Sequence, residues 1–242
     1  MSDLPLNKHI SSGFEKSIEG LREAILEMGG MVEEQLQDSL NSLVKGDIEL
    51  AKKVIKHDKK INRKDVKIDR MCMEILALRQ PTASDLRLVL SAVKAITDLE
   101  RIGDLSQHLA RMGKKLADKG YSMRYYAEIE HTGTKAQKML KASLNAFARM
   151  DAEAALAAME IEKDINRESR ALTRQVATYM MEDPREIKKA MKLLNAIKAI
   201  ERIGDHCENL CEYTIYFVKG EDIRYQDFDE VKNKILDSEM NI

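Results

Sequence analysis

The sequence contains no tryptophan, three prolines and three cysteines among its 242 residues, and aromatic residues make up only 5%. Few prolines mean few helix breakers, and the residues that favour helices, such as alanine, leucine, lysine, glutamate and methionine, are frequent. These features predict an all-α protein. Cys72, Cys207 and Cys211 are odd in number and lack the spacing of a disulfide framework, which is typical of a reducing compartment.

Long apolar segments and an excess of charge of one sign are also lacking. No run approaches the ~20 apolar residues that span a bilayer, and the first residues lack the basic and apolar regions of a secretory signal. We therefore expect a cytoplasmic protein. Lysine and arginine number 40 against 41 aspartates and glutamates, for a net charge of −1. This balance argues against a nucleic-acid-binding protein, which normally carries a basic face or tail.

Recognisable catalytic motifs are absent as well. No Ser-His-Asp arrangement lies at a nucleophile elbow, and no glycine-rich phosphate loop precedes a helix. We therefore expect neither an enzyme nor an organic cofactor.

The sequence does contain an internal repeat. The five residues Glu100–Asp104 recur unchanged as Glu201–Asp205, 101 residues later, and their flanks keep the same register. Further upstream, Ile61–Arg63 recurs as Ile165–Arg167 at a spacing of 104 residues. The two spacings differ by three residues. The stretch of chain between the two repeated segments therefore differs in length by three residues between the repeats, most simply at the turns that contain Pro81 and Pro184. We infer a tandem duplication.

Each repeat is expected to hold three long helices, with a capping box before the third: Thr82 with Asp85, and Asp183 with Glu186. Short connections favour antiparallel neighbours. The predicted fold is two tandem three-helix bundles, with the boundary in the connector that begins at Lys119. The expected domains are 1–119 and 120–220, followed by a polar tail at 221–242 with room for one short helix; the expected helices are about 12–45, 48–79, 82–119, 123–150, 151–181 and 183–219.

The repeated motif can be placed on its helix at about 100° per residue. Glu100 and Asp104 lie one turn apart beside the stripe that should face the core. Gly103 and Gly204 lie on that stripe, and a glycine inside a helix costs about 1 kcal/mol relative to alanine. We expect a close helix–helix contact there, with space for a ligand as the alternative. The predicted core stripe consists of Leu99, Ile102, Gly103, Ser106, Leu109 and Ala110.

Two acids one turn apart repel each other slightly, and packing does not explain why both copies keep them. Carboxylates at this spacing suit hard or borderline cations. We therefore predict metal sites, with solvated surface acids as the alternative. Asp98 has Ala199 as its counterpart and should not be essential to a site shared by both repeats. The main candidate ligands are Glu100, Asp104, Glu201 and Asp205, with Asp58, Asn62, Glu162, Asn166 and His108 as less certain ones.

Two other arrangements of residues could bind metal. Glu128 and His131 form one Glu-x-x-His motif, but a ferritin-like di-iron bundle needs a second one. His206, Cys207 and Cys211 could bind a soft metal, since the two cysteines lie one turn apart. The first repeat, however, has Leu105, Ser106 and Ala110 at the matching positions. We expect buried thiols instead.

With these motifs in place, the sequence resembles the PhoU family. The resemblance covers nearly the whole chain and depends on the acid-x-x-x-Asp motif in the third helix of each repeat. The sequence departs from the family pattern at Glu162 and Leu105, where aspartate and histidine are expected. The supporting segments are Gly-Asp-His-Cys-Glu-Asn-Leu at 204–210, the Asp-x-x-Ile-Asn-like segments at Asp58 and Glu162, and Pro-x-x-x-Asp-Leu-Arg at 81–87.

The resemblance implies a negative regulator of the phosphate-starvation response. Such proteins are similar in fold to paired three-helix bundles, are often homodimers, and link the ATPase subunit of the phosphate ABC transporter to a sensor histidine kinase. The resemblance also implies metal clusters at the acidic faces, with iron, zinc, manganese or magnesium as candidates, and attachment to the membrane through partners. A di-metal redox bundle and a purely structural scaffold remain open alternatives.

Overall fold

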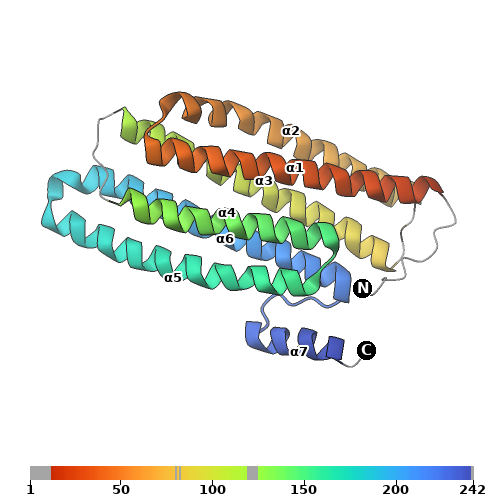
Figure 1. The fold of residues 1–242 in the computed structure, drawn as a ribbon. Coiled ribbons are helices and arrows are strands. Elements are labelled where there is room, and N and C mark those ends of the chain that lie inside the picture. The colour runs from red at the N-terminus through yellow and green to blue at the C-terminus, as the bar shows by residue number, and fades with distance from the viewer. Residues whose placement is uncertain (1–11, 80, 82, 119–124, 241–242) are drawn as a thin grey trace.

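The computed structural model describes residues 12–79, 81, 83–118 and 125–240. Helices dominate these residues and no strand occurs among them, which confirms the all-α prediction. Within the same residues, no helix is both long enough and apolar enough to cross a bilayer. The elements are α1 (Ser12–Lys45), α2 (Ile48–Arg79), α3 (Ala83–Ala117), α4 (Tyr126–Arg149), α5 (Ala152–Glu182), a 3₁₀ turn η1 (Pro184–Glu186), α6 (Ile187–Lys219) and α7 (Phe228–Met240) (Figure 1).

Local backbone chemistry ends the helices where the sequence predicts. Gly46 (φ 65°) and Gly220 (φ 77°) adopt left-handed conformations directly after α1 and α6, a region that favours glycine because it has no Cβ. Asp47 and Asp151 then begin α2 and α5, since each carboxylate accepts a backbone N–H from three residues later at 2.9 Å. The expected boundary connector lies outside the described residues.

The capping box expected before α6 does not form. Asp183 does accept a hydrogen bond from the backbone N–H of Arg185 at 3.1 Å. Glu186 does not return a bond to Asp183, whose own N–H binds the carbonyl of Tyr179. Instead, Glu186 pairs with Lys189 at 3.1 Å. Pro184 opens a 3₁₀ turn before α6, which shifts Glu186 from its expected capping position. In the other box, Thr82 lies outside the described residues.

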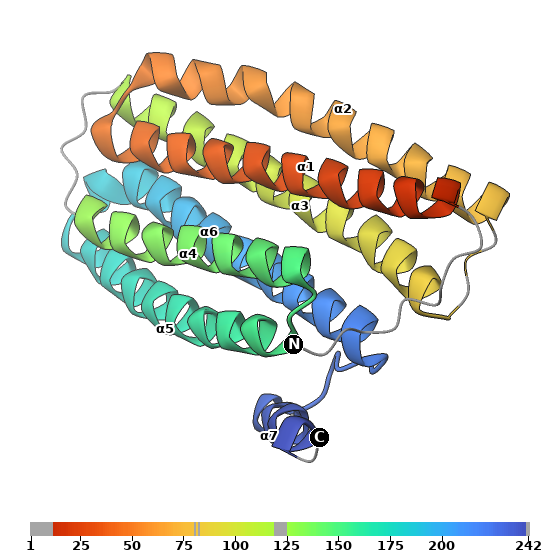
Figure 2. The same cartoon turned by 45° about the vertical axis from the view of Figure 1, so that its right-hand side comes forward.

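The six long helices share one core. Helices α3 and α6 lie side by side at the centre, while α2 and α5 form opposite outer edges (Figures 1 and 2). One continuous cluster of buried hydrophobic side chains includes residues from all six. The stripe predicted from 99 to 110 is buried throughout, as its periodicity required. The acidic motifs of both repeats therefore lie on the two central helices.

The repeated glycines make close helix contacts, as expected. A Cβ on Gly103 would lie 3.3 Å from Ile61 Cγ2, and one on Gly204 would lie 3.5 Å from Ile165 Cδ1. Ile61 and Ile165 are themselves repeated residues. The two repeats thus use the same contact to pack the third helix against the second, and the space beside each glycine is filled by isoleucine.

Helix α7 covers part of α5 in the second repeat. Val231 and Ile235 are buried in a second cluster with residues of α5 and α6. Lys232 pairs with Glu160 at 2.5 Å, and Lys163 lies 3.9 Å from the ring centroid of Phe228. In the described part of the first repeat no element covers α2 in this way, and its outer side is open (Figure 2).

Candidate functional site

The acidic face of the first repeat is partly buried. Glu100 and Asp104 of α3 are both half-buried. Burial raises the pKa of Glu100, and the nearby charge of Asp104 raises it further. Arg101 lies 3.8 Å from Glu100 and opposes this shift. These acids are therefore not freely solvated, and a positive ion beside them would relieve the repulsion.

Asp58 of α2 is buried and held by amide groups. Its Oδ1 accepts a hydrogen bond from Gln35 Nε2 at 3.0 Å, and its Oδ2 accepts one from Gln107 Nε2 at 2.8 Å. Gln35 also donates to the carbonyl of Gly103 at 3.0 Å, while its own Oε1 contacts His57 Nδ1 at 3.0 Å. Burial raises the pKa of Asp58 and the Gln35 bond lowers it. Both carboxylate oxygens thus already have donors.

The second repeat gathers a different set of acids. Glu162 of α5 is 8% exposed, and burial, followed by the charges of Glu208 and Asp205, raises its pKa to about 7. Burial and the neighbouring Glu201 also raise the pKa of Asp205. Glu208 stands 101 residues after Gln107, so a carboxylate replaces the amide donor of the first repeat. The first face instead has Asp65, whose charge raises the pKa of Glu100 and whose counterpart is Ser169, so four carboxylates gather at each face.

An asparagine oxygen is left unsatisfied in each repeat. Asn62 Oδ1 and Asn166 Oδ1 are both buried without a hydrogen-bond partner. Asn166 donates its amide to Glu162, so its oxygen lies beside the second acidic face. An unpaired buried oxygen is costly, and a cation would satisfy it. The unpaired oxygen of Asn166, beside Glu162 with its raised pKa, fits an oxygen-coordinated metal.

The side chains do not form a closed coordination sphere as they stand. No three histidine, cysteine, aspartate or glutamate side chains within the described residues are grouped closely enough to hold an ion. Glutamate side chains have rotatable stems, and Glu201 and Glu208 would have to rotate to share one ion.

The less certain candidate His108 is exposed on α3. Its counterpart Asn209 takes another role, since its Nδ2 donates to Asp98 Oδ1 at 3.2 Å. Asp98 is 6% exposed and also lies 2.6 Å from His206 Nδ1. Asp98 thus joins α3 to α6, next to Asp205. It links the two repeats, and the expectation that it is not essential to a site shared by both repeats stays a prediction.

The two remaining arrangements have ordinary surroundings. Cys207 and Cys211 are free and buried, and burial raises the pKa of Cys211 to about 12. The prediction that these two cysteines are buried thiols is confirmed. Glu128 and His131 are exposed on α4, where His131 Nε2 lies 3.6 Å from Glu168.

Sequence reasoning missed three residues of these faces. Gln107 and Glu208 could have been found, because the 101-residue spacing aligns them. Gln35 could not, since it lies on α1 and no motif or repeat marks it.

Comparison with known proteins places the chain in a family. The family model for the PhoU domain matches residues 25–112 and 129–214. The chain is 43% identical over 230 residues to the phosphate-specific transport system accessory protein PhoU homolog of Pseudomonas aeruginosa, covering 95% of each chain. It is 43% identical over 237 residues to the accessory protein PhoU of Escherichia coli, covering 98% of this chain and 97% of that one.

Solved structures agree. The crystal structure of PhoU from Pseudomonas aeruginosa is 44% identical and superposes with a TM-score of 0.84, covering 86% of this chain and 100% of that one. The crystal structure of the phosphate transport system regulatory protein PhoU from Streptococcus pneumoniae is 29% identical, with a TM-score of 0.80 and coverage of 86% and 98%. The chain belongs to the PhoU family.

Proposed function

We propose that this protein regulates phosphate uptake as an accessory component of a phosphate-specific transport system. The observation that carries the proposal is the near full-length match to relatives with that name, at 43% identity. Those relatives are accessory proteins rather than enzymes, and we assign no catalytic residue.

Within this role, the protein acts as a cytoplasmic adaptor and negative regulator. It couples the ATPase subunit of the phosphate ABC transporter to the sensor histidine kinase, works as a homodimer, and reaches the membrane through these partners. Long helices with exposed faces at both edges of the molecule supply separate surfaces for two partners (Figure 2). The supporting argument for these finer roles is membership of the PhoU family.

The acidic faces bind metal ions in this proposal. Glu201, Asp205, Glu162 and Glu208 would hold an ion at the second face together with the orphan oxygen of Asn166, and Glu100, Asp104 and Asn62 would do so at the first. Oxygen ligands favour magnesium, manganese or iron, whereas zinc accepts fewer of them. The ion would supply the positive charge that the clustered carboxylates lack.

The regulatory role is tested by deleting the gene and following a phosphate-starvation reporter in phosphate-rich medium. The reporter should stay on without the protein and be repressed when the gene is restored. Normal repression in the deletion strain would disprove a negative regulator. A pull-down with the ATPase subunit and the cytoplasmic part of the kinase, with and without chelator, then tests the adaptor role and its need for metal.

The metal role is tested on the purified protein. The double variant Asp104→Ala, Asp205→Ala should lose bound manganese, measured by elemental analysis after dialysis, while circular dichroism shows intact helices. Asp69→Ala removes an exposed acid from the outer side of α2 and serves as the control. Unchanged manganese in the double variant would favour the structural scaffold with solvated acids.

The di-metal redox alternative requires histidine ligands inside the bundle. His108, a less certain candidate ligand, and His131 of the Glu-x-x-His motif are both exposed. His57 and His206 are half-buried near the two faces, where their Nδ1 atoms contact Gln35 and Asp98. A redox site would have to use the other ring nitrogen of one of them.

A further inference from the structure

The outer face of α2 carries a continuous row of basic side chains. Eight exposed lysines and arginines occur between residues 52 and 70, and Asp69 is the exposed acid in that segment. At 1.5 Å per residue the row is about 27 Å long. We call it the α2 basic stripe: Lys52, Lys53, Lys56, Lys59, Lys60, Arg63, Lys67 and Arg70.

Most of this charge is not neutralised within the molecule. Lys52 pairs with Glu49 at 2.7 Å, but the other seven members form no ion pair in the part of the chain that the structure describes. The neighbouring Lys64 is not a member, because it is half-buried and pairs with Glu27 of α1. The stripe therefore presents seven unpaired positive charges to solvent.

The fold does not require the stripe. With the 104-residue spacing of the repeat, Lys53 corresponds to Ala157, and Lys56 and Lys60 correspond to Glu160 and Asp164 of α5. The second repeat thus forms the same three-helix arrangement with small or acidic residues at these three positions, whereas Lys59, Arg63 and Arg70 correspond to the basic residues Lys163, Arg167 and Arg174. Its outer surface is also partly covered by α7, whereas none of the described elements covers the outer surface of α2 in this way.

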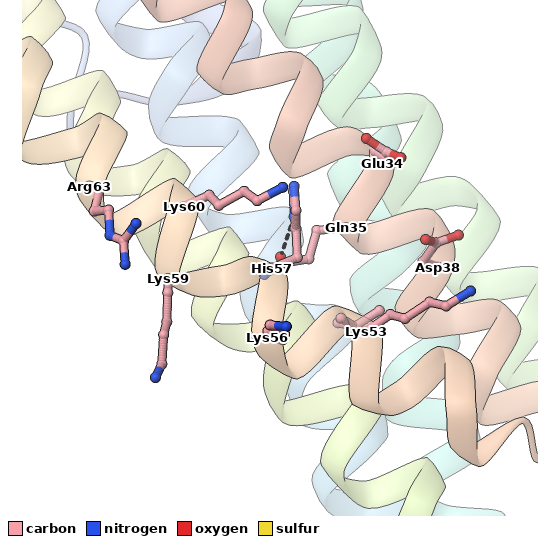
Figure 3. A pocket seen from close by; sticks show the side chains of 10 residues that line it. Glu34, Gln35, Asp38, Lys53, Lys56, His57, Lys59, Lys60 and Arg63 are labelled. Atoms are coloured by element: carbon pink, nitrogen blue, oxygen red, sulfur yellow. Dashed lines mark hydrogen bonds between the residues drawn. The ribbon is translucent and has the colours of Figure 1, made fainter.

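The basic side chains spread over the helix instead of converging on one point. A groove of about 530 Å³ lies between α1 and α2 and is lined by Lys53 and Lys60. In Figure 3 these two extend toward α1, while Lys59 and Arg63 point away from it. The α1 wall of the groove carries Glu34 and Asp38, which would repel a small anion. An extended anionic surface fits this spread of charge better than a small ligand does.

The composition of the stripe distinguishes a lipid surface from a protein partner. Specific protein interfaces depend on buried aromatic or apolar anchors, but Val66, 50% exposed, is the one large apolar side chain exposed between residues 52 and 70. Lysines on flexible stems act as point charges that need no fixed geometry. Such clusters are attracted to anionic headgroups in proportion to their number.

We propose that the α2 basic stripe binds the anionic headgroups of a phospholipid membrane. Helix α2 lies along one edge of the bundle (Figure 2), and all eight members of the stripe are exposed, so the row can approach a flat surface. This contact goes beyond the adaptor role, because it gives the protein its own affinity for lipid without a protein partner. Binding without apolar insertion should be reversible and should weaken as salt screens the charges.

The test is co-sedimentation of the full chain with vesicles. The protein should bind vesicles that contain phosphatidylglycerol and not vesicles of phosphatidylcholine alone, and higher salt should reduce binding. The variant Lys53→Gln, Lys56→Gln, Lys60→Gln should lower the partition coefficient roughly 100-fold, since each basic residue near the surface contributes about fivefold.

A matched control removes the same charge elsewhere. Lys138 and Lys141 of α4 and Lys198 of α6 are exposed, and none of them forms an ion pair in the described part of the chain. The variant Lys138→Gln, Lys141→Gln, Lys198→Gln should retain most of the binding, and circular dichroism should show both variants folded.

Three results would overturn the proposal. They are no binding of the native chain to anionic vesicles, equal losses in the two triple variants, and stripe-dependent binding to inorganic polyphosphate or duplex DNA without binding to vesicles. No kinase or transporter is present in the assay, so its result is independent of the adaptor role.

Discussion

Replacing Glu162 by glutamine should change how the stability of the metal-free protein depends on pH. Glu162 is 8% exposed, and its pKa is raised from 4.5 to about 7 by burial and by the charges of Glu208 and Asp205. The folded state therefore favours the protonated carboxyl. Its ionisation at neutral or higher pH adds another negative charge to the acidic face.

The sign and size follow from linkage. The stabilising contribution of the protonated group is complete below its unfolded pKa of about 4.5 and is lost as pH rises through the folded value of about 7. At 1.36 kcal/mol per pKa unit, this shift corresponds to about 3 kcal/mol as an upper bound. Glutamine cannot ionise. The variant should therefore be more stable than the native protein at pH 8 and nearly equal to it at pH 5.

Thermal unfolding followed by circular dichroism, with chelator present, measures this difference. In a chain of this size, 1 kcal/mol shifts Tm by about 2–4 °C, so Glu162→Gln should raise Tm by several degrees at pH 8. Glu160→Gln is the control, because the hydrogen bond with Lys232 lowers the pKa of Glu160 and its removal should bring no gain at high pH. The same Tm difference at pH 5 and pH 8 would refute the reasoning.

Three further predictions concern packing. Gly113→Ala should lower the free energy of unfolding by roughly 1–3 kcal/mol in urea titrations, because the added Cβ would lie 2.8 Å from the backbone of α1. Gly30→Ala should instead raise it by about 0.5–1 kcal/mol, because nothing lies within 4 Å of the added Cβ. A chain that ends at Gly220 should have a lower Tm, since loss of α7 uncovers the apolar cluster on α5 and α6. Asp98→Asn should cost roughly 1–3 kcal/mol in the same titrations by weakening the bond with His206. An unchanged stability for Gly113→Ala, for the shortened chain or for Asp98→Asn would contradict the packing described.

Periodicity and the repeat predict the helices, the buried stripe and the acidic motifs, because these depend on contacts within one helix or on identity between copies. The role of Asp98 is one that these patterns do not predict. Its partners His206 and Asn209 lie more than 100 residues away, and local spacing does not reveal that α3 packs against α6. Gln35 was missed for the same reason. The capping box at Asp183 failed because Pro184 starts a 3₁₀ turn.

The net charge of the chain does not reveal where its charged residues gather. A value of −1 correctly describes the chain as balanced, yet the basic residues of α2 are gathered on its open face while acids gather on the central helices. Helical periodicity alone could have located the stripe, but it does not reveal that α7 packs on α5 and leaves α2 uncovered by it.

The bond between Asp98 and His206 joins the two helices that carry the acidic motifs, so a movement of one helix is transmitted to the other. Asp98 lies two residues before Glu100 on α3, and His206 directly follows Asp205 on α6. A shift of either helix that accompanies ion binding must move this bond and the buried core that both helices share. If each face binds an ion, as proposed above, ion binding at one face should therefore change the affinity of the other.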